Sequence, residues 1–287
     1  MFNPAAVLAT AFADHLVDGY RMVYGRRDPD HGSIIRAMAQ LAVERISSSD
    51  ALYHDVNHTV LVTLVGQTIL RGRIMVEEVR PEDWLHFTVA TLCHDIGYLR
   101  GICPGDQDGR YVVDGKGTMI DAPRGASDAF LAPYHIERGK IFVRHRCRNL
   151  EPLNAERIAR AIELTRFPIP LGDEHAETGT EAALVRAADL IGQLGDPDHA
   201  GKLNALYYEF VETGFARQLG YDSPADIAEQ FPKFFWSKVE PCLDTALRHL
   251  ERTVEGKQWI AQLYAHVFVE EHTRKRAGPD RGADAAG

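Results

Sequence analysis

The chain has 287 residues, of which 45% are apolar and 25% charged, and its formal net charge is −9. This is the composition of a globular protein with a sizeable core, and its acidic balance argues against a general nucleic-acid binder, which needs a basic face. A nucleotide substrate stays open, because a bound metal can supply local positive charge. The scattered cysteines indicate reduced thiols in a cytoplasmic protein, and no segment has the character of a signal peptide or membrane span.

Apolar residues at helical spacing predict helices along most of the chain. In chain order they cover residues 4–24, 32–47, a segment that Ser47–Asp50 would cap and that runs to about Leu70, a segment from Pro81 to a stop at Gly97, 129–148, 154–165, 178–193, 199–218, 224–250 with an interruption at Pro232, and 255–274. Between them, residues 100–128 predict one long Gly-rich loop with a hairpin around "RYVVDGKGTMI". We therefore expect a single all-α domain over 1–274 and a disordered tail at 275–287.

Histidine and aspartate stand on three predicted helices that are otherwise apolar. His54 and His58 are four residues apart, so on a helix they share one face. The dipeptide His94-Asp95 ends the next helix, and Asp189 lies among small and apolar residues in "EAALVRAADLIGQL". Each signal alone has ordinary explanations. Together they indicate a metal site, because side chains of this kind that converge inside a helix bundle are typical ligands.

Asp189 in particular needs a partner, because a buried carboxylate without one is costly. An ion pair, for example with Arg186, and a metal ion explain it equally well when it is taken alone. His135 and His145, in "PYHIERGKIFVRHR", are further ligand candidates. The loop at 100–128 follows the His-Asp dipeptide directly and could close over a site there.

The order of these motifs resembles that of the HD-domain metal-dependent phosphohydrolases, and within them the catalytic domain of class I cyclic nucleotide phosphodiesterases. "YHDVNHTVLV" is similar to that family's Y-H-N-x-x-H-A segment, and "HDIGY" to its H-D motif. "RAADLIGQLGDPDHAGKLNALYYEFVETG" resembles the stretch from A-D-L to E-F-x-x-x-G, and "EQFPKFFWSKVEP" resembles the segment with the nucleotide-gripping Gln and Phe. The resemblance covers about residues 50–265 in segments, with the metal core at about 50–195, and implies a multi-helix bundle.

The resemblance implies two divalent ions. The first, Zn, Fe or Mn, would have four ligands: His58, His94, Asp95 and Asp189. Asp95 would bridge to a second ion, Mg or Mn, held mainly by waters. His54 would be a general acid one turn before His58 and not a ligand. Asp55, where the family carries Asn, is expected to be a cap or an orienting partner.

The implied reaction is hydrolysis of a small phosphate ester by metal-activated hydroxide, most simply of a phosphodiester such as a cyclic nucleotide. Gln230 and Phe234 would form the nucleotide clamp, although their spacing is one residue longer than in the family. Arg166 stands where the family often has an acid, and it would either contact phosphate or form a structural ion pair. A nucleic-acid polymer and a membrane are not expected partners.

Two functions of other classes stay open. One is an HD-type di-iron oxygenase, which needs extra histidines on the second ion; His135 and His145 could supply them. The other is a non-catalytic regulatory protein that binds a nucleotide. His54 beside a full ligand set argues against the regulatory protein, because binding alone does not need a general acid.

Overall fold

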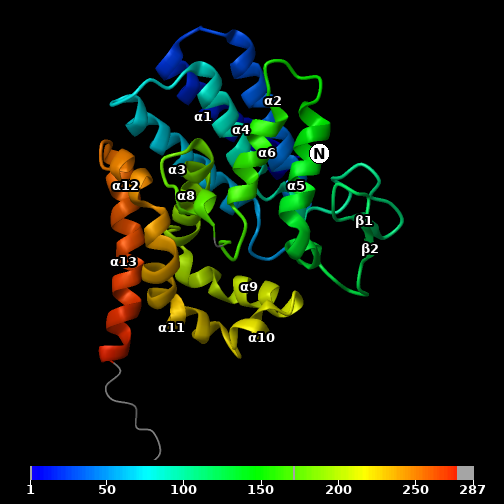
Figure 1. Cartoon of the computed structure of the whole chain (residues 1–287), viewed down its shortest axis with the longest axis vertical. Helices are drawn as coiled ribbons and strands as arrows, with labels where there is room; N and C mark the ends of the chain where they lie inside the picture. The colour runs from blue at the N-terminus through cyan, green and yellow to red at the C-terminus, as the bar shows by residue number, and fades with distance from the viewer. Residues whose placement is uncertain (1, 171, 277–287) are drawn as a thin grey trace, which may run out of the picture.

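The computed structural model describes residues 2–170 and 172–276, and these confirm the predicted all-α fold (Figure 1). The helices are α1 (Pro4–Tyr24), α2 (Pro29–Ile46), α3 (Val56–Ile74), α4 (Pro81–Cys93), α5 (His135–Cys147), α6 (Ala155–Leu164), α7 (Asp173–Ala176), α8 (Glu181–Leu194), α9 (His199–Glu212), α10 (Phe215–Leu219), α11 (Pro224–Phe234), α12 (Asp244–Leu250) and α13 (Val254–Arg276). Short 3₁₀ segments cover η1 (Ile96–Tyr98), η2 (Asp128–Tyr134) and η4 (Glu240–Cys242), and a wider π-type turn covers η3 (Phe235–Val239).

Capping decides where α3 begins, and here the sequence-based boundary was wrong. The helix begins at Val56, because the side chain of Asp55 accepts a hydrogen bond from the backbone N–H of His58 at 2.9 Å. The segment 47–50 instead follows the end of α2. The prediction that Asp55 is a cap is confirmed, and His54 lies before the helix rather than on it.

Three other predicted helices are divided. Residues 199–218 break at Gly214, whose φ of 76° suits glycine. Residues 129–148 begin as the 3₁₀ segment η2, and the α-helix starts only at His135. The helix expected over 224–250 does not stop at Pro232 but continues to Phe234 and then widens into η3.

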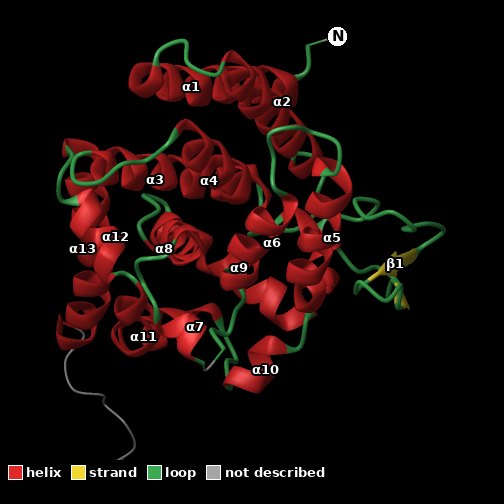
Figure 2. Cartoon of the chain, turned by 45° about the horizontal axis from the view of Figure 1, so that its top comes forward, coloured by secondary structure: helices red, strands yellow, loops and turns green. Residues whose placement is uncertain are grey.

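The helices are arranged in layers around one core. α1 and α2 lie side by side as an outer layer over α3 and α4, and α9, α10 and α11 lie at the opposite end of the molecule (Figures 1 and 2). Large side chains from several of these helices are fully buried where the layers meet, including Leu16, Ile35, Trp84, Phe87 and Ile69. Each such side chain stabilises the fold by roughly 1.5–3 kcal/mol through burial.

A glycine allows α8 to cross α3 at close range. A Cβ atom added at Gly192 would lie 2.8 Å from the Cα atom and 2.9 Å from the backbone N of Val62. No larger residue fits without moving one of the two helices. Because His58 lies one turn before Val62 and Asp189 lies one turn before Gly192, this crossing brings the histidine and the aspartate together.

A second glycine brings η1 against the start of α5. A Cβ atom at Gly97 would lie 1.9 Å from the carbonyl oxygen of His135. The backbone contact therefore requires glycine and places His135 beside Asp95, two residues before Gly97. Gly97 was predicted to end the preceding helix, but α4 ends at Cys93.

The loop at 100–128 contains the predicted hairpin, formed by the antiparallel strands β1 (Arg110–Val112) and β2 (Met119–Asp121). The hairpin projects from one edge of the molecule (Figure 1). The side chain of Arg138 on α5 holds the start of the loop that carries this hairpin. This fully buried guanidinium donates to the backbone oxygen of Leu99 at 2.7 Å and forms an ion pair with Asp106 at 2.9 Å.

The C-terminal helix extends slightly beyond its predicted end. α13 runs to Arg276, so the first two residues of the expected tail are helical, and residues 277–287 lie outside the described part of the chain. Within residues 2–170 and 172–276, none of the helices combines the length and the apolar character that a bilayer span requires.

We predict that Arg138→Met lowers the free energy of unfolding by about 3–5 kcal/mol, because it leaves the carboxylate of Asp106 buried without its counter-ion, with only the backbone N–H groups of Cys103 and Val112 as donors. Arg110→Met is the control, because the Arg110–Asp121 pair is long, at 3.6 Å, and its side chains are 57% and 85% exposed. That change should cost less than about 1 kcal/mol. Chemical denaturation measures both, and equal losses would contradict the role of Arg138.

Candidate metal centre

Four side chains converge where α3, the end of α4 and α8 meet: His58, His94, Asp95 and Asp189. Nε2 of His58 lies 3.2 Å from Nε2 of His94, 3.2 Å from Oδ2 of Asp95 and 3.4 Å from Oδ1 of Asp189. Nε2 of His94 lies 3.0 Å and 3.6 Å from the same two carboxylate oxygens. The structure thus brings together all four residues that the sequence pattern singled out.

The dipeptide reaches the cluster because the chain leaves α4 at this point. His94 is the C-cap of α4, and Asp95 precedes η1 with a φ of −105° and a ψ of 6°. On a continuous helix the two side chains would diverge by about 100°. The change of backbone conformation at Asp95 instead lets both side chains turn toward His58.

The donor set fits a divalent metal ion. Nitrogen and oxygen ligands at about 2.0–2.2 Å from one ion are about 3–3.5 Å from one another. The two imidazole nitrogens lie 3.0–3.6 Å from each other and from one oxygen of each aspartate, and His58, His94 and Asp95 form the tightest group. Nδ1 of His94 is engaged by the carbonyl oxygen of Thr91 at 2.8 Å, so Nε2 is the ring nitrogen that faces the two carboxylates. Two carboxylates facing this nitrogen call for positive charge between them, either a proton on Nε2 or a metal cation.

The electrostatics of the cluster also favour positive charge. Burial lowers the pKa of His58, but hydrogen bonds to Asp189 and Asp95 outweigh it and raise that pKa to about 10. Burial would raise the pKa of Asp95, but the charge of His94 and the hydrogen bonds from both histidines hold it well below its usual value. Both shifts show that the cluster favours a positive charge, which a proton or a metal cation can supply. Metal binding would displace the proton.

The expected alternative for Asp189, an ion pair with Arg186, is wrong. The guanidinium of Arg186 donates to the backbone oxygens of His175 at 2.8 Å and Glu177 at 3.2 Å. Within the described residues no carboxylate lies within 4.0 Å of it. The carboxylate of Asp189 faces His58 and the adjacent histidine instead.

His135 and His145 have different environments. His135 is buried, its Nδ1 donates to Ala132 O at 2.6 Å, and its Nε2 lies 3.8 Å from Oδ1 of Asp95, the oxygen that faces away from the first cluster. It could therefore contribute to a second ion. His145 could not, because it is exposed and lies ten residues, about 15 Å, further along α5.

Beside the cluster, His54 forms a buried pair with Glu209 of α9. Nδ1 of His54 lies 2.5 Å from Oε2 of Glu209, whose other oxygen accepts backbone hydrogen bonds from Tyr53 at 2.6 Å and from His54 at 3.3 Å. Burial lowers the pKa of His54, but the charge and hydrogen bond of Glu209 outweigh it, so the pKa stands above its usual value. The carboxylate of Glu209 therefore favours the protonated form of the imidazole.

The sequence analysis did not identify Glu209, although a signal was present. Leu203, Leu206 and Glu209 are all buried and follow one another at three-residue spacing, so the acid continues the apolar stripe of α9. Tyr53 packs against the two leucines, and this contact places the next residue, His54, beside Glu209. A carboxylate on a buried stripe indicates a specific partner.

Tyr98 was also missed. Its ring stacks on His54 with centroids 4.3 Å apart, and its other neighbour is the ring of His135 at 4.6 Å. The phenolic oxygen lies 3.4 Å from Nε2 of His54. With Nδ1 occupied by the glutamate, Nε2 is the ring nitrogen left to act toward the adjoining cavity.

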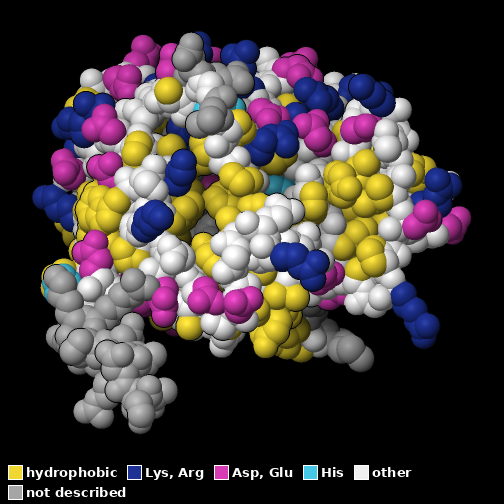
Figure 3. Space-filling view, turned by 60° about the horizontal axis from the view of Figure 1, so that its bottom comes forward, with side chains coloured by type: hydrophobic (Ala, Val, Ile, Leu, Met, Phe, Trp, Pro, Cys, Tyr) yellow, Lys and Arg dark blue, Asp and Glu magenta, His cyan; other side chains and the backbone are white. Residues whose placement is uncertain are grey.

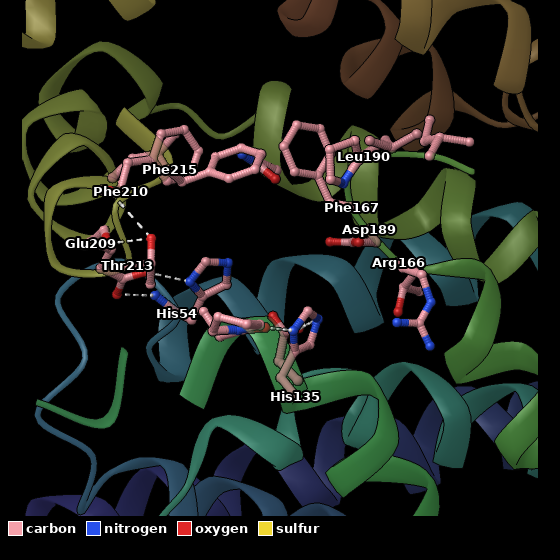
Figure 4. A pocket seen from close by; sticks show the side chains of 18 of the residues that line it. His54, His135, Arg166, Phe167, Asp189, Leu190, Glu209, Phe210, Thr213 and Phe215 are labelled. Atoms are coloured by element: carbon pink, nitrogen blue, oxygen red, sulfur yellow. Dashed lines mark hydrogen bonds and ion pairs between the residues drawn. The ribbon is translucent and has the colours of Figure 1, made fainter. Parts of the chain in front are cut away.

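That cavity has a volume of about 360 Å³. His54, Asp189 and His135 line one side of it, and the rings of Phe167 and Phe210 line the other (Figure 4). From outside, hydrophobic side chains gather over much of the face of the molecule that carries a hollow, and a histidine is visible within it (Figure 3). The cavity thus has ionisable side chains on one side and aromatic rings on the other.

The three predicted substrate-binding residues differ in position. Phe234 and Arg166 line the cavity. Arg166 is also ion-paired, with Nε 2.6 Å from Glu163 and Nη2 2.7 Å from Glu137. Gln230 is exposed on α11 and does not line the cavity, because the inward face of that helix carries other side chains.

The position of the loop at 100–128 in the sequence left open whether it closes over the site. None of its residues lines the cavity, whose lining passes from Tyr98 to Ala132 along the chain. The buried Arg138 ties the loop to the far side of η1 instead. The loop therefore supports the start of α5 and is not part of the cavity wall.

Residues 2–273 match the family model described as Npun_R2479-like. The chain belongs to the Npun_R2479-like family. The match includes every residue of the metal cluster, the His54–Glu209 pair and the cavity. No curated protein and no solved structure matches the chain.

For this Npun_R2479-like protein we predict that Asp95→Ala loses bound metal, because it removes an oxygen ligand next to two imidazoles. Glu209→Gln is the control, because Glu209 lines the same cavity but contacts His54 rather than the cluster. It should keep the wild-type metal content. Elemental analysis after purification measures both proteins, and a full complement of metal in Asp95→Ala would show that the ligand assignment is wrong.

Proposed function

We propose that this protein is a metal-dependent phosphohydrolase of the HD type that acts on a small phosphate ester. The observation that carries the proposal is the His54–Glu209 pair, which places a charged imidazole beside a cluster of metal-ligand type and at the edge of the same cavity. Such a pair supplies a proton to a reacting group, which binding alone does not require.

The residues that would hold the ion are His58, His94, Asp95 and Asp189. A divalent ion bound there supplies Lewis-acid activation of water and neutralises phosphate charge. His135 is placed to contribute to a second ion through its Nε2, which faces the free oxygen of Asp95. The mixed nitrogen and oxygen donors suit Zn, Fe or Mn at the first position, and Mg or Mn at the second.

His54 would donate the proton that the leaving oxygen needs. Its Nδ1 is engaged by Glu209, which orients the ring and keeps it positive, so the proton to be transferred is on Nε2. The phenolic oxygen of Tyr98 lies next to this nitrogen. The aromatic ring of Tyr98 stacks on the imidazole and so limits its rotation. As the ester bond breaks, the proton moves from Nε2 to the departing oxygen.

The cavity favours a small substrate with an apolar part. A volume of about 360 Å³ admits a small organic ester and no folded nucleic acid. Phe167, Phe210 and Phe215 would contact the apolar part. The amides available for recognition in the lining are those of Gln193 and Gln218, whereas the expected Gln230 faces solvent.

The two alternative functions have less support. A di-iron oxygenase of this type needs extra histidines on the second ion; of the two candidates, His135 lies 3.8 Å from Asp95, whereas His145 is exposed further along α5. A purely regulatory nucleotide-binding protein gains nothing from the buried His54–Glu209 pair, which costs desolvation of two charges. Hydrolysis is the reaction that uses every one of these groups.

The experiment that tests the proposal is turnover of phosphate monoesters, phosphodiesters including cyclic nucleotides, and single-stranded oligonucleotides, each with Mn²⁺, Mg²⁺, Zn²⁺ and Fe²⁺. We expect hydrolysis of a small ester that is lost in Asp189→Asn. A polymer substrate would require many phosphate contacts and would depend steeply on salt. Oligonucleotide cleavage that dominates and collapses as salt rises would overturn the proposal.

We predict that Glu209→Gln moves the basic limb of the pH–rate profile to lower pH. In the wild type the pKa of His54 is raised, so the imidazolium persists to higher pH than that of an ordinary histidine and is lost as pH rises through the raised pKa. Without the carboxylate, burial lowers the pKa, and the limb should move by roughly 1–3 pH units. The measurement is kcat/KM as a function of pH for one ester.

His54→Asn is the companion variant. It should lose turnover by roughly 10²–10⁴-fold, with the smallest loss for a nitrophenyl ester, whose leaving group needs no proton. An unchanged basic limb in Glu209→Gln, or an equal loss for all leaving groups in His54→Asn, would reject the acid role of His54.

A further inference from the structure

One face of α8 lines the cavity with residues at helical spacing: Arg186, Asp189, Leu190, Gln193 and Leu194. Arg186 and Asp189 are three residues apart on this face, so their Cβ atoms are about 5–6 Å from each other. The arginine therefore lies one turn from the metal cluster and borders the same cavity. Nothing in the proposed hydrolysis has used it so far.

Among the described side chains, none supplies a counter-ion to the buried charge of Arg186. Its side chain is 1% exposed, and no described carboxylate lies within 4.0 Å of it. Two of its N–H groups donate to the backbone oxygens of His175 and Glu177, and its Nε has no partner. A guanidinium stays protonated in proteins, so the protein pays the cost of burying this charge with only part of its hydrogen bonds made.

Comparison with two other arginines shows that this is unusual in the molecule. Arg138 is equally buried, but Asp106 neutralises it at 2.9 Å. Arg166 borders the same cavity, but Glu163 and Glu137 neutralise it. Burial lowers the pKa of Arg186, as expected for a cation that lacks a negative neighbour. A group that enters the cavity can supply the missing negative charge.

We propose that Arg186 binds a second anionic group of the substrate, a phosphate or a carboxylate, while the metal cluster holds the phosphate that is cleaved. The inference rests on the proposed function, and it narrows the substrate to a small phosphate ester with a second acidic group a few bonds from the first. The separation of about one helical turn suits both groups of one small molecule. A cyclic nucleotide has only one acidic group, so it is not the preferred substrate.

The binding test needs neither metal nor turnover. Metal is removed with a chelator, the chelator is removed by gel filtration, and inorganic phosphate is titrated by calorimetry. Arg186→Met should weaken phosphate binding by roughly 10-fold or more, because it removes charge-assisted hydrogen bonds in a buried site. Arg166→Met, the matched control, should change it by less than about 3-fold, because its charge is already balanced. Equal effects of the two changes would overturn the inference.

A wild-type measurement covers the case in which Arg186→Met does not fold. The Nε–H signal of Arg186 in a ¹H–¹⁵N spectrum, assigned by its loss in Arg186→Lys, should shift during the phosphate titration, and the signal of Arg166 should not. An unmoved Arg186 signal at saturating phosphate would also overturn the inference.

A matched pair of esters links this site to turnover. Phenyl phosphate and carboxyphenyl phosphate differ only in a carboxylate, and the wild type should prefer the second through a lower KM. Arg186→Met should remove that preference by raising KM for the carboxylated ester alone. If phosphate binding depends on Arg186 but no ester is hydrolysed, the anion site stands and the proposed function fails. If esters are hydrolysed with no preference, the inference fails and the proposed function stands.

Discussion

The close crossing of α3 and α8 is the contact on which the candidate site depends. His58, the His94-Asp95 dipeptide and Asp189 come from three separate parts of the chain, and only a short distance between these helices lets their polar atoms meet. Gly192 sets that distance, because a Cβ atom there would overlap the backbone of Val62. Glycine at this position gives up the packing of a side chain, and in return the two helices lie close enough for the four polar groups to meet.

Around the cavity, each buried charge is balanced in a different way. The carboxylates of Asp95 and Asp189 face imidazoles and attract a proton or a cation. Glu209 is paired with His54, which gives a fixed ion pair with a transferable proton. In the described part of the chain, the hydrogen-bond partners of Arg186 are backbone oxygens. Under the proposed function, these three environments would suit a ligand that brings negative charge to the cluster and to Arg186.

The sequence predicted which histidines and aspartates lie together better than it predicted which residues line the rest of the cavity, for a physical reason. Asp189 stands out because a carboxylate interrupts a buried helix face, and that signal needs no knowledge of the fold. Glu209 carried the same signal, but its partner became evident only when the segment before α3 was placed against α9. His145 failed because ten residues along a helix turn the side chain about 80° away from the face of His135. Gln230 failed because similarity of a segment does not define which face of α11 points inward.

The charge of the cluster ties metal loading to proton release. With the pKa of His58 raised to about 10, the protein without metal holds a proton among these four groups at neutral pH. An ion that takes the lone pair of Nε2 must displace that proton, so apparent metal affinity rises with pH, by about tenfold per pH unit for each proton released. The His54–Glu209 pair lies outside the ligand cluster and keeps its own proton. The fold thereby keeps the proton that a metal ion would displace apart from the proton that the proposed hydrolysis would use, although both imidazoles come from one short segment of the chain.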